Sequence, residues 1–433
     1  MRKWLFLLLL QPVWGFAQVY VPLVRLDKAL DPDRAEAYSH ADAQGSVLLI
    51  RDQSEARLYI FDADFQLQRE VGADAFPSQE EADILGITLD ESHIRVYVQD
   101  RSDLIQVIEM GRNGEPGSNY RLDVAALKGA GSHWEAFTFR GEMHVLRIPA
   151  SGSSVRLCRF SPDGSFYAQE FPVKASELLR LHRSNIRQMD SLSNPGLDMT
   201  WNPAKVYFSG DYIYLTLDER GRTHILKVYL AEGYMDEWSV SAPQVAGPSL
   251  FTHSNSYLCQ GNLYQIAAGG DSLKLHISAL SDSSRRQKFV SGPGEWPFPE
   301  VSGPFFRDEA GAESALPDAA AWFDAARQSP HVAVSVQPDG PESLRIEVGA
   351  VTPSMVRGVS GMVIEEKVRV ALFSARLRRE DFAPLAPMQP LAVRRLPPNY
   401  RSQALPTAFR IAGRQVLGYY DPDRQQYVML GQR

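Results

Sequence analysis

A hairpin motif centred on glycine recurs four times along the chain. In each copy, apolar residues stand four and two positions before the glycine. Three copies have another apolar residue three positions after it, and His144 takes that place in the first copy. Alternate residues of a strand face the same side, so this spacing predicts a half-buried strand before a tight glycine turn. The copies are FTFRGEMHVL (Phe137–Leu146), VYFSGDYIYL (Val206–Leu215), YLCQGNLYQI (Tyr257–Ile266) and FRIAGRQVLG (Phe409–Gly418).

The stretch Trp134–Val173 extends the first copy to four short strands. Its last hairpin is predicted at Ser161-Pro162-Asp163-Gly164, because proline fixes φ early in a turn and glycine tolerates positive φ at its end. A four-stranded antiparallel unit of about 40 residues is typical of one propeller blade. The repeat therefore resembles the β-propeller superfamily in its architecture. This resemblance implies an all-β fold of blades arranged around an axis.

Three weaker copies raise the expected number of blades to six or seven, and seven is favoured. They lie at Ser46–Ile60, Gly86–Val98 and His331–Val348. We expect the N-terminal strand to complete the last blade and so close the ring. A β-sandwich followed by a second β-domain is the alternative that the pattern leaves open.

The copies are unevenly spaced, so insertions must lie between blades. Residues 174–192 carry apolar side chains at roughly helical spacing, and Pro317–Arg327 has few helix breakers. We predict a short helix or helical loop at the first place and a helix at the second. Ser291–Leu316, which is rich in proline, glycine and acidic residues, is predicted to be a long surface loop. Residues 18–433 are thus predicted to form one propeller domain.

The first 17 residues have the composition of a secretory signal peptide. Arg2 and Lys3 precede the apolar run Trp4–Leu10, and Gly15-Phe16-Ala17 ends in a small residue at the expected cleavage site. We predict cleavage after Ala17 and a periplasmic or secreted protein. An N-terminal membrane anchor is the alternative, although the apolar run is shorter than the roughly 20 residues that a spanning helix needs.

Composition argues against several kinds of partner and cofactor. The net charge is −7 and there is no basic block, which argues against nucleic-acid binding. The two cysteines, Cys158 and Cys259, fall in different predicted strands and suit buried apolar positions better than a disulfide. No metal-binding spacing or phosphate-binding loop occurs, so neither a metal nor a cofactor is expected.

Candidate site residues follow from the phase of the repeat. His133, Asn202 and His253 each stand eight residues before a repeat glycine, and Trp134 and Trp201 stand beside the first two. Equivalent positions of a propeller lie on one face, so these residues are predicted to line a ligand pocket there. The alternative is that they satisfy nearby backbone groups. Trp296, in the long loop, is a further candidate for stacking on a sugar or capturing a protein.

Two functions from different classes remain open. The first is a non-catalytic, monomeric binding or scaffold module for a protein, peptide or glycan. The second is a hydrolase or lyase acting on an extracellular polymer, with His133 or His253 as base and Asp198 as its carboxylate partner. Charged side chains converging in an open central funnel would favour the enzyme, whereas a plugged channel would favour the binding module.

Overall fold

The computed structural model describes most of the chain between Tyr20 and Gln432. The described residues are 20–432 except 28, 31–34, 53–54, 78–81, 101–103, 124–132, 140, 162–164, 184, 190–195, 210, 246–253, 270–271, 293–299, 309–311, 339–342, 358–362, 379–403 and 412–413. The predicted signal peptide, His253 and Trp296 therefore lie outside the described residues.

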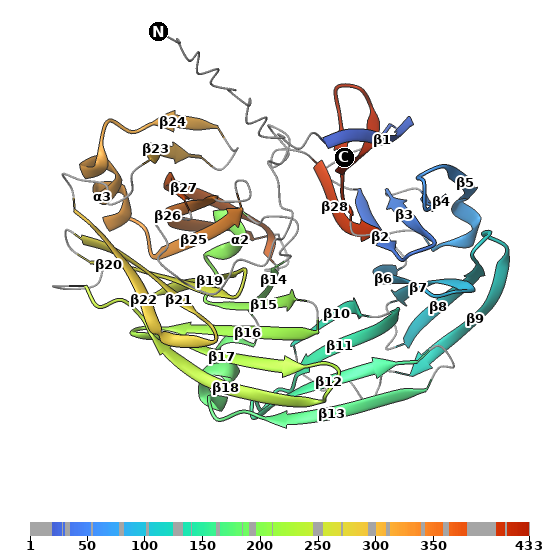
Figure 1. Ribbon diagram of the computed structural model, residues 1–433, viewed down its shortest axis with the longest axis horizontal. Helices are drawn as coiled ribbons and strands as arrows, with labels where there is room; N and C mark the ends of the chain where they lie inside the picture. The colour runs from blue at the N-terminus through green and yellow to red at the C-terminus, as the bar shows by residue number, and fades with distance from the viewer. Residues whose placement is uncertain are drawn as a thin grey trace, which may run out of the picture.

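Seven sheets of four or five strands follow one another around a common centre (Figure 1). We number them as blades in chain order. Blade 1 comprises β2 (Glu36–Ala41), β3 (Gly45–Arg51), β4 (Ala56–Asp62) and β5 (Leu67–Val71). Blade 2 comprises β6 (Ala82–Leu89), β7 (His93–Asp100), β8 (Leu104–Gly111) and β9 (Pro116–Asp123). Blade 3 comprises β10 (His133–Phe139), β11 (Glu142–Ile148), β12 (Ser154–Phe160) and β13 (Phe166–Pro172).

The remaining blades carry the additional strands. Blade 4 comprises β14 (Ile186–Met189), β15 (Ala204–Ser209), β16 (Tyr212–Glu219), β17 (Arg222–Tyr229) and β18 (Tyr234–Ser241). Blade 5 comprises β19 (Asn255–Cys259), β20 (Asn262–Gly269), β21 (Ser272–Ala279) and β22 (Asp282–Ser291). Blade 6 comprises β23 (Glu300–Arg307), β24 (Glu313–Ala315), β25 (His331–Pro338), β26 (Ser343–Arg357) and β27 (Val363–Arg378). Blade 7 comprises β28 (Ala404–Ile411), β29 (Arg414–Asp421), β30 (Gln426–Gln432) and β1 (Tyr20–Asp27).

This arrangement is a seven-bladed β-propeller, which confirms the predicted fold class and decides the blade number. β1 pairs antiparallel with β30, so the N-terminal strand completes the last blade as expected. A 3-10 turn (Ala73–Ala75) and three short helices, α1 (Ser176–His182), α2 (Leu197–Thr200) and α3 (Ala319–Arg327), interrupt the strands. In the described parts of the chain, no helix combines the length and apolar character that crossing a bilayer requires.

All four glycine-centred copies form the first antiparallel hairpin of a blade, made by its two inner strands except in blade 4, where β14 lies inside β15. The register pairs that flank each turn, such as Phe139 with Glu142 and Cys259 with Asn262, leave a two-residue loop. Gly261 has φ +74°, a conformation that glycine adopts without steric cost. The weaker copies at Gly86–Val98 and His331–Val348 also form inner hairpins.

The copy at Ser46–Ile60 is out of phase with the others. It forms β3 and β4, the second and third strands of blade 1, and the inner hairpin is β2–β3. There the Asp42 carboxylate accepts hydrogen bonds from the Gln44 and Gly45 backbone amides and shapes the turn. β3 and β4 are both apolar and buried along most of their length, as the strands of an inner hairpin are, so the pattern could not identify which hairpin this was.

Two of the predicted insertions need correction. The predicted loop 291–316 contains β23 and β24, and β23 pairs with β27. Pro304 is tolerated in β23 because it lies where the register shifts between Ser302 and Phe305. The helical insertion predicted at 174–192 contains α1, and the strand β14, which was not predicted, follows it with Ile186 and Met189 buried. The helix predicted over 317–327 is confirmed by α3, whose first turn is capped by the Asp318 carboxylate.

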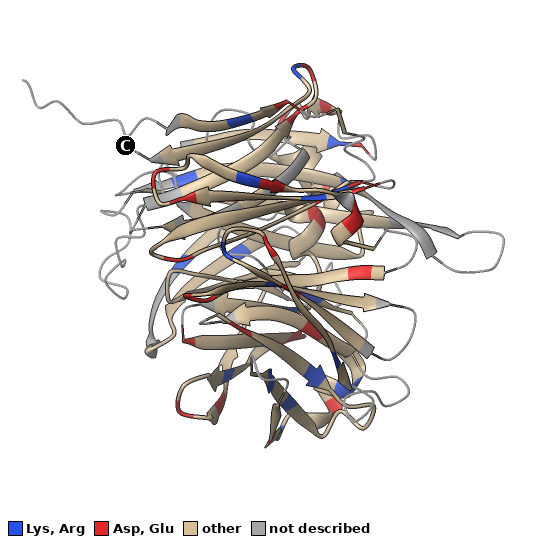
Figure 2. Ribbon diagram, turned by 90° about the vertical axis from the view of Figure 1, so that its right-hand side faces the viewer, with Lys and Arg blue, Asp and Glu red and all other residues tan. Residues whose placement is uncertain are grey.

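The core consists of apolar layers between neighbouring blades. On β15, Ala204 and Val206 are buried against blade 3, whereas Tyr207 belongs to the layer shared with blade 5. Each blade therefore packs through both faces, and its side chains alternate between two neighbours. On the side of the molecule shown in Figure 2, acidic and basic residues are interspersed along the strands.

Candidate functional site

The chain itself occupies the axial side of blade 4. β14 pairs in parallel with β15, inside the strand that is innermost in an ordinary four-stranded blade. α2 follows and packs on blade 6, where Leu197 is buried against Ala333 of β25 and Val351 of β26. These two residues lie on the face of blade 6 opposite the one that packs on blade 5. β14 and α2, which we call the axial insertion, thus link blade 4 to the far face of blade 6 (Figure 1).

Two of the predicted site residues, Asn202 and His133, make local contacts, whereas Trp201 contacts another blade. Asn202 is buried and its Oδ1 accepts a hydrogen bond from the Ala204 amide at 3.1 Å. The His133 Nε2 atom lies 3.0 Å from Glu135 Oε1 on its own strand. The Trp201 ring lies 4.6 Å from the ring of His331, centroid to centroid.

The remaining candidates differ in their surroundings. Trp134 is half-buried against the apolar layer between blades 2 and 3. Asp198, the suggested carboxylate partner of a catalytic histidine, is exposed on α2. His133 is the first residue of β10 and Asn202 lies just before β15. The pocket expected from the repeat phase stays a prediction.

A buried ion pair lies between blades 4 and 5. Lys205 Nζ lies 3.2 Å from Asp218 Oδ2, and both side chains are 0% exposed. Asp218 also accepts hydrogen bonds from the Thr223 hydroxyl at 2.7 Å and the Ser256 amide, in blade 5, at 2.8 Å. Burial lowers the pKa of Lys205, and the attraction of Asp218 opposes that shift. This pair joins blades 4 and 5 and offers no surface to a substrate.

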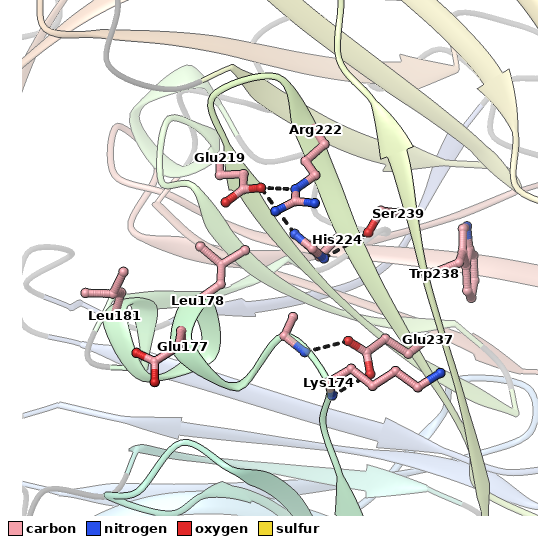
Figure 3. A pocket seen from close by; sticks show the side chains of 11 residues that line it. Lys174, Glu177, Leu178, Leu181, Glu219, Arg222, His224, Glu237, Trp238 and Ser239 are labelled. Atoms are coloured by element: carbon pink, nitrogen blue, oxygen red, sulfur yellow. Dashed lines mark hydrogen bonds and ion pairs between the residues drawn. The ribbon is translucent and has the colours of Figure 1, made fainter.

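An open groove of about 500 Å³ lies between α1 and the outer strands of blade 4 (Figure 3). Glu237 of β18 positions the segment that leads into the helix, because its carboxylate accepts hydrogen bonds from the Lys174 and Ala175 amides, each at 2.8 Å. On the helix, Leu178 is buried and Leu181 is 70% exposed, and both line the groove. The helix therefore presents an apolar side chain to solvent beside a polar wall.

A chain of hydrogen bonds forms the polar wall of the groove. The Ser239 hydroxyl lies 2.9 Å from His224 Nδ1, and His224 Nε2 lies 3.3 Å from Glu219 Oε1 (Figure 3). The Arg222 guanidinium also donates to Glu219. Burial would raise the pKa of Glu219, but the hydrogen bonds from Arg222 and His224 outweigh it and lower the pKa. The carboxylate thus stays ionised and orients the imidazole.

Few residues of the sequence pointed to this groove. His224 and Ser239 are partners across β17 and β18, and α1 comes from the insertion before β14. Leu178 and Leu181 were the residues that hinted at it. Their helical spacing predicts that both are buried, but the structure buries Leu178 and leaves Leu181 exposed. Within the described residues, no three His, Cys, Asp or Glu side chains are grouped in a way that could hold a metal ion.

Comparisons with known proteins show neither a family nor a function for this chain. No protein-family model matches the chain, and no curated protein matches it. Among solved structures, the WD40 domain of SCAP from fission yeast is 9% identical, covers 96% of this chain and 98% of its own, and has a TM-score of 0.31. The Dos1 propeller is 10% identical over 75% of each chain, with a TM-score of 0.30.

A third similar structure is the SapL1 lectin in complex with alpha methyl fucoside. It is 11% identical, covers 72% of this chain and 88% of its own, and has a TM-score of 0.24. At such identities and TM-scores, none of these proteins indicates a function. The sheet order and strand pairing of the chain itself establish the β-propeller.

Proposed function

We propose that this protein is an exported, non-catalytic propeller that binds a polypeptide segment at the groove beside α1. The observation that carries the proposal is the axial insertion. β14 lines the inner edge of blade 4 and α2 is packed on blade 6, so the protein's own chain takes up the place where a propeller enzyme would hold a substrate. The ionic pair of Lys205 and Asp218 is enclosed as well. We therefore place the ligand away from the axis, in the groove beside α1.

The composition of the groove suits an extended peptide with an apolar anchor. Leu181 and the buried Leu178 offer an apolar floor, and Glu177, Arg222 and His224 offer both signs of charge and hydrogen-bonding groups along it. A small apolar anchor surrounded by polar groups is the common arrangement of peptide-binding surfaces.

The test uses peptides selected from a random library on the purified mature chain. Leu181→Asp places a charge on the apolar floor, and we expect it to weaken the selected peptide at least about tenfold by calorimetry. Leu67→Asp is the matched control, because Leu67 is an exposed leucine on β5 of blade 1. Failure to select a peptide, or equal affinity of both variants, would contradict the proposal.

Export is the second part of the proposal and rests on the N-terminal residues alone. We expect the protein in the periplasm or medium, with a mature N-terminus at Gln18. N-terminal sequencing of the fractionated protein checks this. Recovery from the membrane fraction with Met1 intact would favour the anchor instead.

The hydrogen-bond chain supports a second candidate function, hydrolysis. Hydrogen bonds link the Ser239 hydroxyl to the His224 imidazole and that imidazole to the Glu219 carboxylate. This is the arrangement that activates a serine nucleophile. Against it, Ser239 and His224 are ordinary cross-strand partners, and Arg222 shares the carboxylate. A fluorophosphonate that labels wild-type protein but not Ser239→Ala would establish the hydrolase; we expect no labelling of either.

A further inference from the structure

At the end of blade 4 away from the groove, three tyrosines and one lysine form a column across the sheet. Tyr229 and Tyr234 are stacked, with ring centroids 4.0 Å apart and planes inclined by 17°. Tyr212 meets Tyr229 edge-on at 5.1 Å. Lys227 Nζ lies 3.8 Å from the ring centroid of Tyr212 and 4.3 Å from that of Tyr229. The ammonium is thus held by aromatic rings on the inner part of the column.

Strand register explains the column. Tyr212 of β16 pairs with Tyr229 of β17, which pairs with Tyr234 of β18, so the three rings follow one another across the sheet. β18 is the outermost strand of blade 4. The last ring, Tyr234, is accordingly 46% exposed. The column ends in an aromatic surface that the protein leaves open to solvent.

Polar groups surround this open ring. Asp236 is exposed on the same strand, two residues from Tyr234, and its carboxylate accepts a hydrogen bond from the Tyr229 hydroxyl at 2.9 Å. Glu232 is exposed in the turn between β17 and β18. An aromatic face bordered by hydroxyl and carboxylate groups matches a molecule with one apolar face and a rim of hydroxyls.

We propose that Tyr234 is the stacking platform of a carbohydrate-binding site for neutral pyranosides, with Asp236 accepting hydrogen bonds from the sugar hydroxyls. The C–H face of a pyranose packs on an aromatic ring, while its equatorial hydroxyls point outward to such acceptors. Asp236 and Glu232 repel anionic sugars. The rings of Tyr212 and Tyr229 already hold the Lys227 ammonium. We therefore expect the open Tyr234 ring to stack on a neutral sugar ring rather than on the charged side chain of a peptide.

This site is independent of the groove. His224 of the groove and Tyr229 of the column are five residues apart on β17, so they lie on opposite faces and toward opposite ends of the strand. The carbohydrate site therefore adds a ligand class to the proposed peptide binding, and either site can fail without the other.

The test is calorimetric titration of the mature chain with maltohexaose, cellohexaose and mannohexaose, and with a hexamer of galacturonate. We expect at least one neutral hexasaccharide to bind more tightly than the galacturonate hexamer. Tyr234→Ala should weaken that binding at least about tenfold, whereas Tyr234→Trp, which keeps an aromatic face, should retain it.

Tyr167 provides a matched control, because it is 59% exposed on β13, the outermost strand of blade 3. Tyr167→Ala should bind as wild type does. The proposal is overturned if no neutral hexasaccharide binds, if the galacturonate hexamer binds more tightly, or if Tyr234→Ala and Tyr167→Ala have equal effects.

Discussion

Asp218 is the residue on which the joint between blades 4 and 5 depends. It neutralises the buried Lys205 and accepts a hydrogen bond from the backbone of Ser256 in the next blade. Removing one partner of a buried ion pair leaves the other charge without compensation in a place that water does not reach. The loss should therefore be much larger than the loss of an ion pair at the surface.

We predict that Asp218→Asn lowers the free energy of unfolding by about 3 kcal/mol in urea denaturation. Asp324→Asn removes a comparable acceptor, but from an exposed pair with Arg327, and should cost less than about 1 kcal/mol. Equal losses in the two variants would show that the joint does not depend on the buried pair.

The stability of the fold depends on pH through His144. It is buried and stacked on Phe137, and burial is the main reason that its pKa is lowered to about 4. The unfolded chain takes up the proton near the ordinary pKa of about 6.5. The native state therefore binds fewer protons between these values, and stability is full above pH 6.5 and lost as the pH falls toward 4.

We predict that His144 accounts for about 3 kcal/mol of the stability lost between pH 7 and pH 4. His144→Gln should reduce the decline by that amount in urea denaturation at several pH values. His93→Gln, at a histidine whose side chain is 41% exposed, should decline as wild type does. An unchanged decline in His144→Gln would contradict the assigned cause.

At the scale of the element, the inner hairpins depend on turns with positive φ. Gln260 and Gly261 have φ of +50° and +74°, and the space around the Gly261 Cα is open. A methyl group there meets no neighbour, so substitution isolates the cost of the backbone conformation from that of a steric clash.

We predict that Gly261→Ala lowers the free energy of unfolding by about 1 kcal/mol. Gly72 is also in open space but does not have a positive φ, so Gly72→Ala should be neutral or slightly stabilising. Chemical denaturation of both variants measures the difference. A loss at Gly72 as large as that at Gly261 would mean that the turn conformation is not responsible.

At the scale of the whole molecule, closure depends on strands from both ends of the chain. β1 pairs along most of its length with β30, and Leu26 is buried in the apolar layer that includes blade 7. Without β1, the edge of β30 would be left open to water and to other chains.

We predict that deleting residues 1–27 lowers the Tm by at least about 5 °C in calorimetry and promotes aggregation, since it removes both pairing and buried area. Deleting residues 1–17 leaves β1 in place and should give the same Tm as the full-length chain. If the two deletions melt at the same temperature, β1 does not stabilise the ring.

The blades could be predicted from the sequence because their determinants are local. Apolar residues at alternate positions and a glycine at the turn specify a hairpin within about ten residues, and the hairpins at Gly141 and Gly261 formed as predicted. Repetition of a unit that cannot bury both faces alone then implies a ring. The same locality explains the error at Ser46–Ile60, because the hairpin of the second and third strands of blade 1 satisfies the pattern as well.

What only the tertiary structure decided are the contacts between segments distant in sequence. The parallel pairing of β14 with β15 brings α2 onto blade 6, and no local pattern encodes which blade a four-residue helix will reach. The groove beside α1 likewise needed Glu237 of β18 to hold the amides of Lys174 and Ala175, which are more than 60 residues earlier. Short-range spacing determined the blades of this protein, whereas long-range packing determined where its groove and its exposed side chains lie.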